Sequence, residues 1–169
     1  MRAAARSFAI ASHGDQRYGA HPYEVHLAAV VAIAEAAGAG DATIVAVAWL
    51  HDVLEDTSVE EAALRERFGD VVAAAVALVT DPEGADRRAR KEALHRRLEA
   101  LDHGEVPARA ALLVKAADRL ANARASRADN PRLLTMYRRE HPEFRRAVHR
   151  PGLCDEVWAE LDVILGDGG

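Results

Sequence analysis

The chain has 169 residues, half of them hydrophobic, and carries a formal net charge of −5. This length is sufficient for one domain with a single substantial core. The negative charge excludes a global basic field that would hold nucleic acid or an anionic membrane surface, so neither is an expected partner.

Three features of the sequence indicate the cellular compartment. Cys154 is the single cysteine, which excludes an intrachain disulfide and fits a reducing cytosol. Arginines interrupt the apolar residues near the N-terminus, where a signal peptide would have a continuous hydrophobic region. No run approaches the 18 apolar residues of a membrane span. We therefore expect a soluble, cytoplasmic protein.

The first elements predicted along the chain are helices. Residues 2–13 read as a helix closed by Gly14. A polar loop follows, and Pro22 is predicted as the first residue of a second helix that continues over 23–37 and ends at Gly38.

The next predicted helix carries the main cluster of ionisable residues at its end. Asp41 is its predicted N-cap, and a continuous helix is expected from there to Asp56. Ser58 and Glu61 have the spacing of a capping box, which predicts a further helix as far as Gly69.

The second half of the chain is also predicted to be helical, and it shows neither strand alternation nor repeats. Further helices are expected over 71–80, along the basic segment from Arg87, over 108–124, from Pro131 with a restart at Pro142, and over 153–165. The predicted fold is an all-α, single-domain helical bundle over residues 1–169. Its motif-bearing core spans about residues 8–125, with C-terminal helices at 130–166 packed on it.

Ionisable groups gather where the apolar run before His51 ends. On a continuous helix His51 lies above Glu55, and Asp52 lies above Glu55 and Asp56. A helix C-terminus disfavours negative charge by about 0.3 to 1 kcal/mol per group, so a positive partner is expected. Imidazole and carboxylate together suit Zn, Mn, Fe or Mg. The alternative, a solvated acidic helix end, fits poorly because the preceding run is apolar on every side.

Two other helices carry polar residues on apolar stripes. His26 shares a stripe with Val30 and Ile33, where a hydrogen-bonded core histidine and a metal ligand are both open readings. Lys115, Asp118 and Asn122 stand at positions i, i+3 and i+7 of an otherwise apolar helix. That stripe is typical of a partly buried polar site.

The segment from Arg87 to Arg97 holds six basic residues within eleven positions. Such a segment is suited to phosphate groups. A solvated helix face, balanced by Glu92 and Glu99, is an equally good reading, and the sequence does not decide between them.

The spaced series of His26, His51-Asp52 and Asp118 resembles the HD-domain metal-dependent phosphohydrolases. Longer motifs sharpen this resemblance: His13-x-x-Gln16-Arg17, Pro22-Tyr23-x-x-His26, Leu50-His51-Asp52-x-Leu54-Glu55-Asp56-Thr57, and the run from Val114 to Arg124. In this order they resemble the hydrolase domain of the RelA/SpoT alarmone enzymes, and most of all the small stand-alone hydrolases. The resemblance spans about residues 8–125.

The resemblance implies a reaction, a cofactor and residue roles. The family hydrolyses the 3′-diphosphate of guanosine tetra- or pentaphosphate (ppGpp or pppGpp) and releases pyrophosphate. The implied ligands of a single Mn²⁺ ion are His26, His51, Asp52 and Asp118, and the implied acidic pair that handles the water nucleophile is Glu55 with Asp56. The implied substrate contacts are Arg17, Tyr23, Lys115 and Asn122.

The chain departs from the family pattern mainly around the substrate. Leu27 replaces a common proline, Tyr18 a basic residue and Ala125 a hydroxyl residue. These departures leave the metal ligands intact but weaken the case for guanosine. An HD phosphatase acting on another nucleotide or a phosphorylated dinucleotide remains an alternative. A non-catalytic nucleotide-binding module is a further one, which the retained acidic pair disfavours.

Overall fold

The computed structural model describes residues 1–37 and 40–166, and this part of the chain is helical apart from one short hairpin. The elements are α1 (Arg2–His13), β1 (Arg17–Tyr18), β2 (His21–Pro22), α2 (Glu24–Ala36), α3 (Ala42–Leu50), α4 (Val53–Asp56), α5 (Glu61–Phe68), α6 (Asp70–Val79), α7 (Arg87–Glu99), α8 (Val106–Asp129), α9 (Pro131–Val148) and α10 (Asp155–Leu165). The all-α class expected from the sequence is confirmed.

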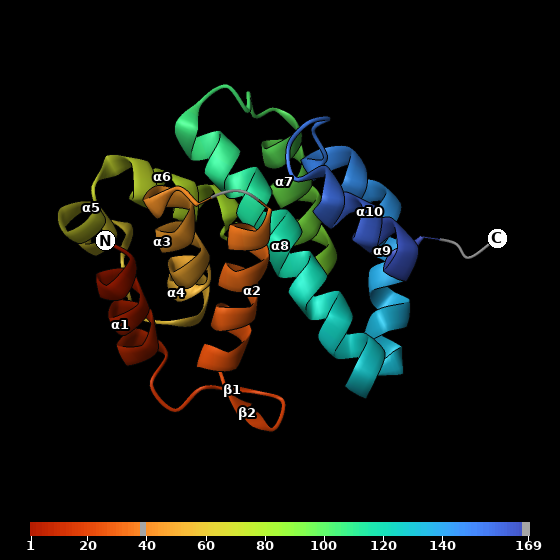
Figure 1. Cartoon of the computed structure of the whole chain (residues 1–169), viewed down its shortest axis with the longest axis horizontal. Coiled ribbons are helices and arrows are strands. Elements are labelled where there is room, and N and C mark those ends of the chain that lie inside the picture. The colour runs from red at the N-terminus through yellow and green to blue at the C-terminus, as the bar shows by residue number, and fades with distance from the viewer. Residues whose placement is uncertain (38–39, 167–169) are drawn as a thin grey trace.

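Helix α8 is the axis of the fold. It packs against α2, α3 and α6 on one side and against α9 and α10 on the other, as Figure 1 shows. Half of its buried positions are alanines, whose small side chains let neighbouring helices approach closely. This placement brings the middle of α8 next to the ends of the N-terminal helices.

Helix α3 is buried all round, as its unbroken apolar run predicts. Every residue from Ile44 to Leu50 is buried, among α1, α2, α6 and α8. The predicted cap is also present, because the backbone N–H of Thr43 donates to Oδ1 of Asp41 over 2.6 Å. No helix among the described residues is long and apolar enough to cross a membrane.

The helix expected to run without interruption from Ala42 to Asp56 is in fact divided. It stops at Leu50, His51 and Asp52 form a turn, and α4 begins at Val53. Asp52 has φ −103° and ψ −2°, outside the helical well. The turn lets two consecutive side chains approach one point, whereas a regular helix separates neighbours by about 100°.

Four predicted boundaries are wrong in detail. Helix α8 continues to Asp129, five residues past its predicted end at residue 124. Pro22 lies in β2, and α2 starts only after Tyr23. Ser58 does not cap α5, which begins at Glu61 without a side-chain cap. The loop before it is closed by Thr57, whose hydroxyl accepts the N–H of Val59. Pro142 lies inside a continuous α9 and does not restart it. The predicted helix end at Gly38 falls outside the described residues.

Candidate metal centre

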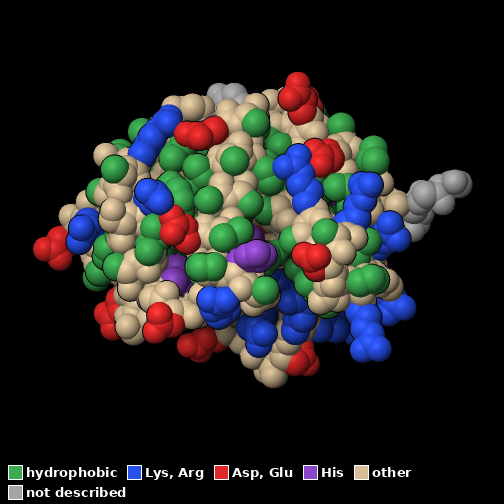
Figure 2. Space-filling view, turned by 60° about the horizontal axis from the view of Figure 1, so that its bottom comes forward, with side chains coloured by type: hydrophobic (Ala, Val, Ile, Leu, Met, Phe, Trp, Pro, Cys, Tyr) green, Lys and Arg blue, Asp and Glu red, His purple; other side chains and the backbone are tan. Residues whose placement is uncertain are grey.

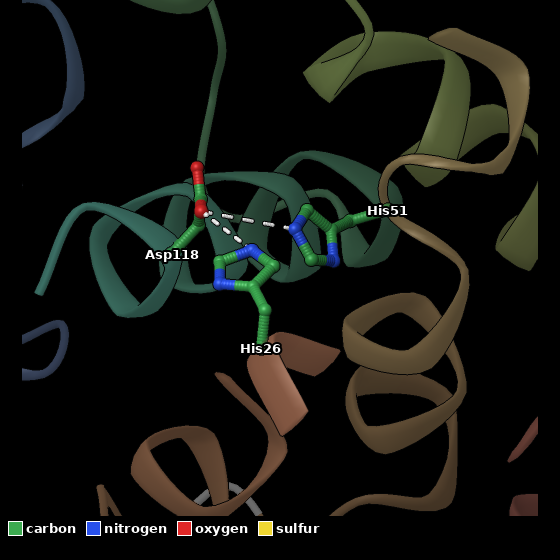
Figure 3. A group of neighbouring side chains, drawn as sticks. All are labelled: His26, His51 and Asp118. Atoms are coloured by element: carbon green, nitrogen blue, oxygen red, sulfur yellow. Dashed lines mark ion pairs between the residues drawn. The ribbon is translucent and has the colours of Figure 1, made fainter. Parts of the chain in front are cut away.

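Three segments far apart in sequence bring two histidines and an aspartate together. His26 comes from α2, His51 from the turn after α3, and Asp118 from α8 (Figure 3). One ligand atom from each lies within 4.8 Å of the others. The Nε2 atoms of His26 and His51 lie 3.3 and 3.8 Å from Oδ1 of Asp118. This arrangement is a site of the size that one metal ion occupies.

Asp52 adds a second carboxylate to the cluster. Its Oδ2 lies 3.0 Å from Nε2 of His51 and 3.7 Å from Nε2 of His26. The same oxygen accepts a 2.6 Å hydrogen bond from the hydroxyl of Tyr23. Tyr23, which the family resemblance places near substrate, therefore holds one of the cluster's carboxylates.

The protonation pattern of His51 fits a metal ligand. Its Nδ1 lies 2.9 Å from the carbonyl oxygen of Ala48, which makes this nitrogen the N–H donor. The opposite nitrogen, Nε2, then presents its lone pair to the cluster, where it is buried and makes no hydrogen bond with any described residue. A divalent cation would satisfy that nitrogen together with the two carboxylates. The donor set thus fits a divalent metal ion.

The electrostatics of the cluster favour positive charge. Burial opposes an imidazolium, but the Asp52 and Asp118 carboxylates outweigh it and raise the pKa of His51 to about 10. Burial likewise opposes an ionised Asp118, yet the imidazoles of His26 and His51 that face it hold its pKa well below the usual range. Without a metal, protons supply the positive charge that the two carboxylates require. A metal ion would displace these protons on binding.

A cavity of about 140 Å³ opens beside the cluster. It is lined by Tyr18, Tyr23, His26, Asp52, Glu55, Arg87, Lys91, Lys115, Asp118, Arg119, Asn122 and Tyr137. Four of these carry a positive charge and come from only two helices, α7 and α8. His26 and His51 themselves are buried. Figure 2 shows the face that carries exposed histidine side chains near its middle, with Lys and Arg side chains gathered below them.

The two arginines of the cavity wall are held in place by α9. Glu140 accepts hydrogen bonds from Arg87 at 3.0 Å and from Arg119 at 3.3 Å. The Arg119 guanidinium also lies over the rings of Tyr137 and Phe144, at 4.6 and 4.3 Å from their centroids. Guanidinium groups fixed in this way keep their orientation for an anionic ligand.

The two lysines of the cavity wall are bound to protein oxygens. Lys115 is 7% exposed, donates to the carbonyl of Val79 at 3.1 Å and lies 3.9 Å from Oδ2 of Asp118. Lys91 forms an ion pair of 2.8 Å with Asp81. Burial and the nearby Lys115 lower the pKa of Lys91. Part of the predicted basic segment therefore faces this cavity.

The two side chains of the acidic pair, Glu55 and Asp56, lie in different surroundings. Glu55 lines the cavity, and its Oε2 accepts the backbone N–H of Asp81 at 3.2 Å. Partial burial and the Asp81 carboxylate raise the pKa of Glu55. Asp56 lies outside the cavity wall, where it accepts a 2.8 Å hydrogen bond from Nε2 of Gln16.

The predicted substrate contacts are also divided. Lys115, Asn122 and Tyr23 line the cavity. Arg17 does not, because its exposed side chain turns back to the carbonyl of Ala20 within the hairpin. The amide of Asn122 is already hydrogen-bonded within the protein, since its Nδ2 donates to Oδ1 of Asp118 over 2.6 Å.

Residue-by-residue reading of the sequence missed Tyr18, Arg119 and Tyr137 as members of the wall. For Arg119 the signal was its place directly after Asp118 in the longest motif. No sequence feature near Tyr137 predicts its place in the wall, because only the packing of α9 on α8 brings it to the cavity.

Comparison with known families identifies the family of the chain. A model of the HD domain family matches residues 4–143. The chain belongs to the HD domain family. In this HD domain protein, His26, His51 and Asp118 form a site that fits a divalent metal ion.

Two curated relatives are each 34% identical to this HD domain protein. One is a probable GTP pyrophosphokinase of Mycobacterium leprae, matched over 94% of the present chain and 20% of the relative. The other is a guanosine-3′,5′-bis(diphosphate) 3′-pyrophosphohydrolase of Aquifex aeolicus, matched over 96% and 21%. The chain thus spans about a fifth of the length of these relatives.

Two solved structures share the fold. A metazoan ortholog of SpoT, described as hydrolysing ppGpp and acting in starvation responses, superposes with a TM-score of 0.81 at 22% identity, covering 96% of this chain and 93% of that one. A Listeria monocytogenes protein superposes with a TM-score of 0.63 at 24% identity, covering 85% and 96%.

Proposed function

We propose that this HD domain protein is an Mn²⁺-dependent hydrolase that removes the 3′-diphosphate of ppGpp or pppGpp as pyrophosphate. The observation that carries the proposal is one juxtaposition. A cluster of two imidazoles and two carboxylates lies against a cavity whose wall holds four cationic side chains. The relative from Aquifex aeolicus is named for this 3′-pyrophosphohydrolase activity, which supports the choice of substrate.

The proposed metal ligands are His26, His51, Asp52 and Asp118. These side chains supply nitrogen and oxygen donors from three segments, a mixture that suits Mn²⁺. A bound divalent cation would supply charge neutralisation for the diphosphate and activation of the attacking water.

The proposed proton acceptor is Glu55. Its carboxylate lines the cavity, and the Asp81 N–H holds one of its oxygens, so the other is free to face a water molecule. A raised pKa brings this carboxylate closer to the operating pH, which suits a general base. Water adds across the 3′ phosphate ester bond, and the products are the nucleoside 5′-di- or triphosphate and pyrophosphate. Asp56 acts outside the cavity in this scheme, through its bond to Gln16.

The cationic wall suits the diphosphate. Arg87 and Arg119 present oriented guanidinium groups to the cavity, and Lys91 and Lys115 line the same cavity with ammonium groups. Arginine binds phosphate oxygens with two parallel hydrogen bonds, and lysine acts as a point charge. We propose that these four residues hold the phosphates.

The nucleoside is proposed to lie in a second cavity of about 550 Å³ that shares Tyr18 with the first. Its described lining contains no Lys or Arg, and includes apolar side chains such as Val25 and Leu133. Ser126 also lines it, and its buried hydroxyl has no hydrogen-bond partner among the described residues. The one acidic side chain in the described lining is Asp129. A cavity whose described lining lacks Lys and Arg, beside a cationic one, matches a molecule with an uncharged base and a charged diphosphate.

The test is a product analysis. Metal-stripped protein is incubated with Mn²⁺ and a panel containing ppGpp, pppGpp, nucleoside mono-, di- and triphosphates and a phosphorylated dinucleotide, and products are separated by ion-exchange chromatography. Release of pyrophosphate from ppGpp supports the proposal. Release of orthophosphate from another nucleotide would select the general HD phosphatase instead. Binding of ppGpp without turnover would select the non-catalytic module.

A further inference from the structure

The two histidines of the metal centre are oriented in different ways. Nδ1 of His51 lies within hydrogen-bond distance of the carbonyl of Ala48. Nδ1 of His26 is buried and has no hydrogen-bond partner among residues 1–37 and 40–166. Histidines that bind metals ordinarily use the second ring nitrogen to fix their orientation. The ring of His26 must therefore be held by packing.

Tyr18 supplies that packing. Its ring stacks on the imidazole of His26, with centroids 4.7 Å apart and planes inclined by 21°. Tyr23 touches the same imidazole less directly, at 5.5 Å and 60°. Because the stacked Tyr18 ring lies flat on the imidazole, it restrains rotation of His26 about its side-chain bonds.

The hydroxyl of Tyr18 reaches a second member of the cluster through Asn122. It donates a 2.8 Å hydrogen bond to Oδ1 of Asn122, whose Nδ2 donates to Oδ1 of Asp118 at 2.6 Å. The two bonds use opposite ends of one amide, so the amide's orientation is defined. That Oδ1 of Asp118 is the oxygen that faces both imidazoles, at 3.3 Å from Nε2 of His26 and 3.8 Å from Nε2 of His51.

The hairpin places Tyr18 over the centre. Tyr18 pairs with His21 across β1 and β2, and Gly19 turns the chain at φ +57°, a left-handed conformation that glycine adopts without strain. The N–H of Tyr23 donates to the carbonyl of Gln16 and ties the hairpin to the start of α2. The ring is thus mounted on a fixed loop next to His26.

We propose that Tyr18 is a positioning residue of the metal centre, which orients His26 by stacking and Asp118 through Asn122. The inference rests on the metal site of the proposed function. It assigns Tyr18 a role in orienting metal ligands, at a position where the family pattern has a basic residue.

The test measures Mn²⁺ binding to metal-stripped protein by isothermal titration calorimetry, together with the melting temperature of the metal-free protein. Tyr18→Leu removes both the ring and the hydroxyl and is expected to raise the dissociation constant about 10- to 100-fold, as loss of an orienting partner does. Tyr18→Phe keeps the stacked ring and is expected to raise it only about threefold. The matched control is Tyr137→Leu, which alters the same cavity at a ring that contacts Arg119, and whose Mn²⁺ affinity is expected to be unchanged.

The outcomes separate this inference from the proposed function. If the parent protein does not bind Mn²⁺, both fail. If the parent binds Mn²⁺ and Tyr18→Leu binds it equally well, or if Tyr137→Leu loses as much affinity as Tyr18→Leu, the positioning role is wrong.

A double-mutant cycle covers the case in which Tyr18→Leu does not fold. Tyr18→Phe and Asn122→Ala break the same chain of hydrogen bonds. The double variant is therefore expected to bind Mn²⁺ no more weakly than Asn122→Ala alone. Fully additive losses would overturn the inference.

Discussion

Gln16 donates a 2.8 Å hydrogen bond from Nε2 to Oδ2 of Asp56 and ties that carboxylate to the loop after α1. The Gln16 side chain is itself held by His13, whose Nδ1 lies 2.8 Å from its Oε1. The neighbouring Glu55 lines the cavity instead. Two adjacent acids therefore have different surroundings, and we expect them to differ in function.

Glu55→Gln is expected to keep Mn²⁺ affinity and lower kcat for ppGpp hydrolysis about 10²- to 10⁴-fold, because the amide cannot accept the proton. Asp56→Asn is expected to lower kcat much less. Calorimetry and initial rates measure the two effects, with Glu66→Gln as a control on an exposed helical position. A Glu55→Gln protein with the parent rate would remove the general-base assignment.

Asp118→Ala is expected to abolish Mn²⁺ binding and activity together. The substitution removes the carboxylate oxygen that faces both imidazoles, at 3.3 and 3.8 Å. Calorimetric titration of the metal-stripped variant with Mn²⁺ checks the first effect directly. Asp15→Ala, at an exposed loop position, is the control. Retention of parent affinity by Asp118→Ala would exclude Asp118 from the ligand set.

Arg87→Gln is expected to raise KM for ppGpp about tenfold with a smaller effect on kcat, because it removes one charge-assisted hydrogen bond to phosphate. The neighbouring Arg88 offers a matched control. Its side chain is 88% exposed and pairs with Glu92 away from the cavity, so Arg88→Gln is expected to leave KM unchanged. Equal KM values for both variants and the parent would show that the basic segment is only a solvated surface.

The pH dependence of hydrolysis is expected to report Glu55. Its pKa is raised by burial and by the Asp81 carboxylate, so Glu55 becomes protonated at a higher pH than an ordinary glutamate. Activity therefore falls as pH decreases through this raised value. Asp81→Asn removes one cause of the shift and is expected to move the acidic limb of kcat to lower pH. A limb that stays in place or moves upward in Asp81→Asn would contradict this account.

Much of the helical pattern could be predicted from local signals. Asp41 caps α3 and Gly14 ends α1 as expected, because capping depends on a few neighbouring residues. The unbroken apolar run from Ile44 to Leu50 correctly indicated a central buried helix. The polar stripe of Lys115, Asp118 and Asn122 is likewise present on one face of α8, because helical periodicity places such residues together.

The site itself depended on contacts that no local pattern encodes. The turn at His51 and Asp52, where a continuous helix was expected, lets both side chains reach His26. Which of two adjacent acids faces the cavity was decided by Gln16, forty positions away. The spacing of residue types along the sequence predicts neither the turn nor which acid faces the cavity.

The sequence by itself determined which residue types were available for a metal and a phosphate, and which helices would carry them, because spacing and capping act over a few positions. Only the tertiary structure decided how those side chains are oriented. Tyr23 meets Asp52 across 29 positions, and Tyr18 meets Asn122 across 104. Orientation arises from such partners, which become neighbours only when α2, α3 and α8 pack together.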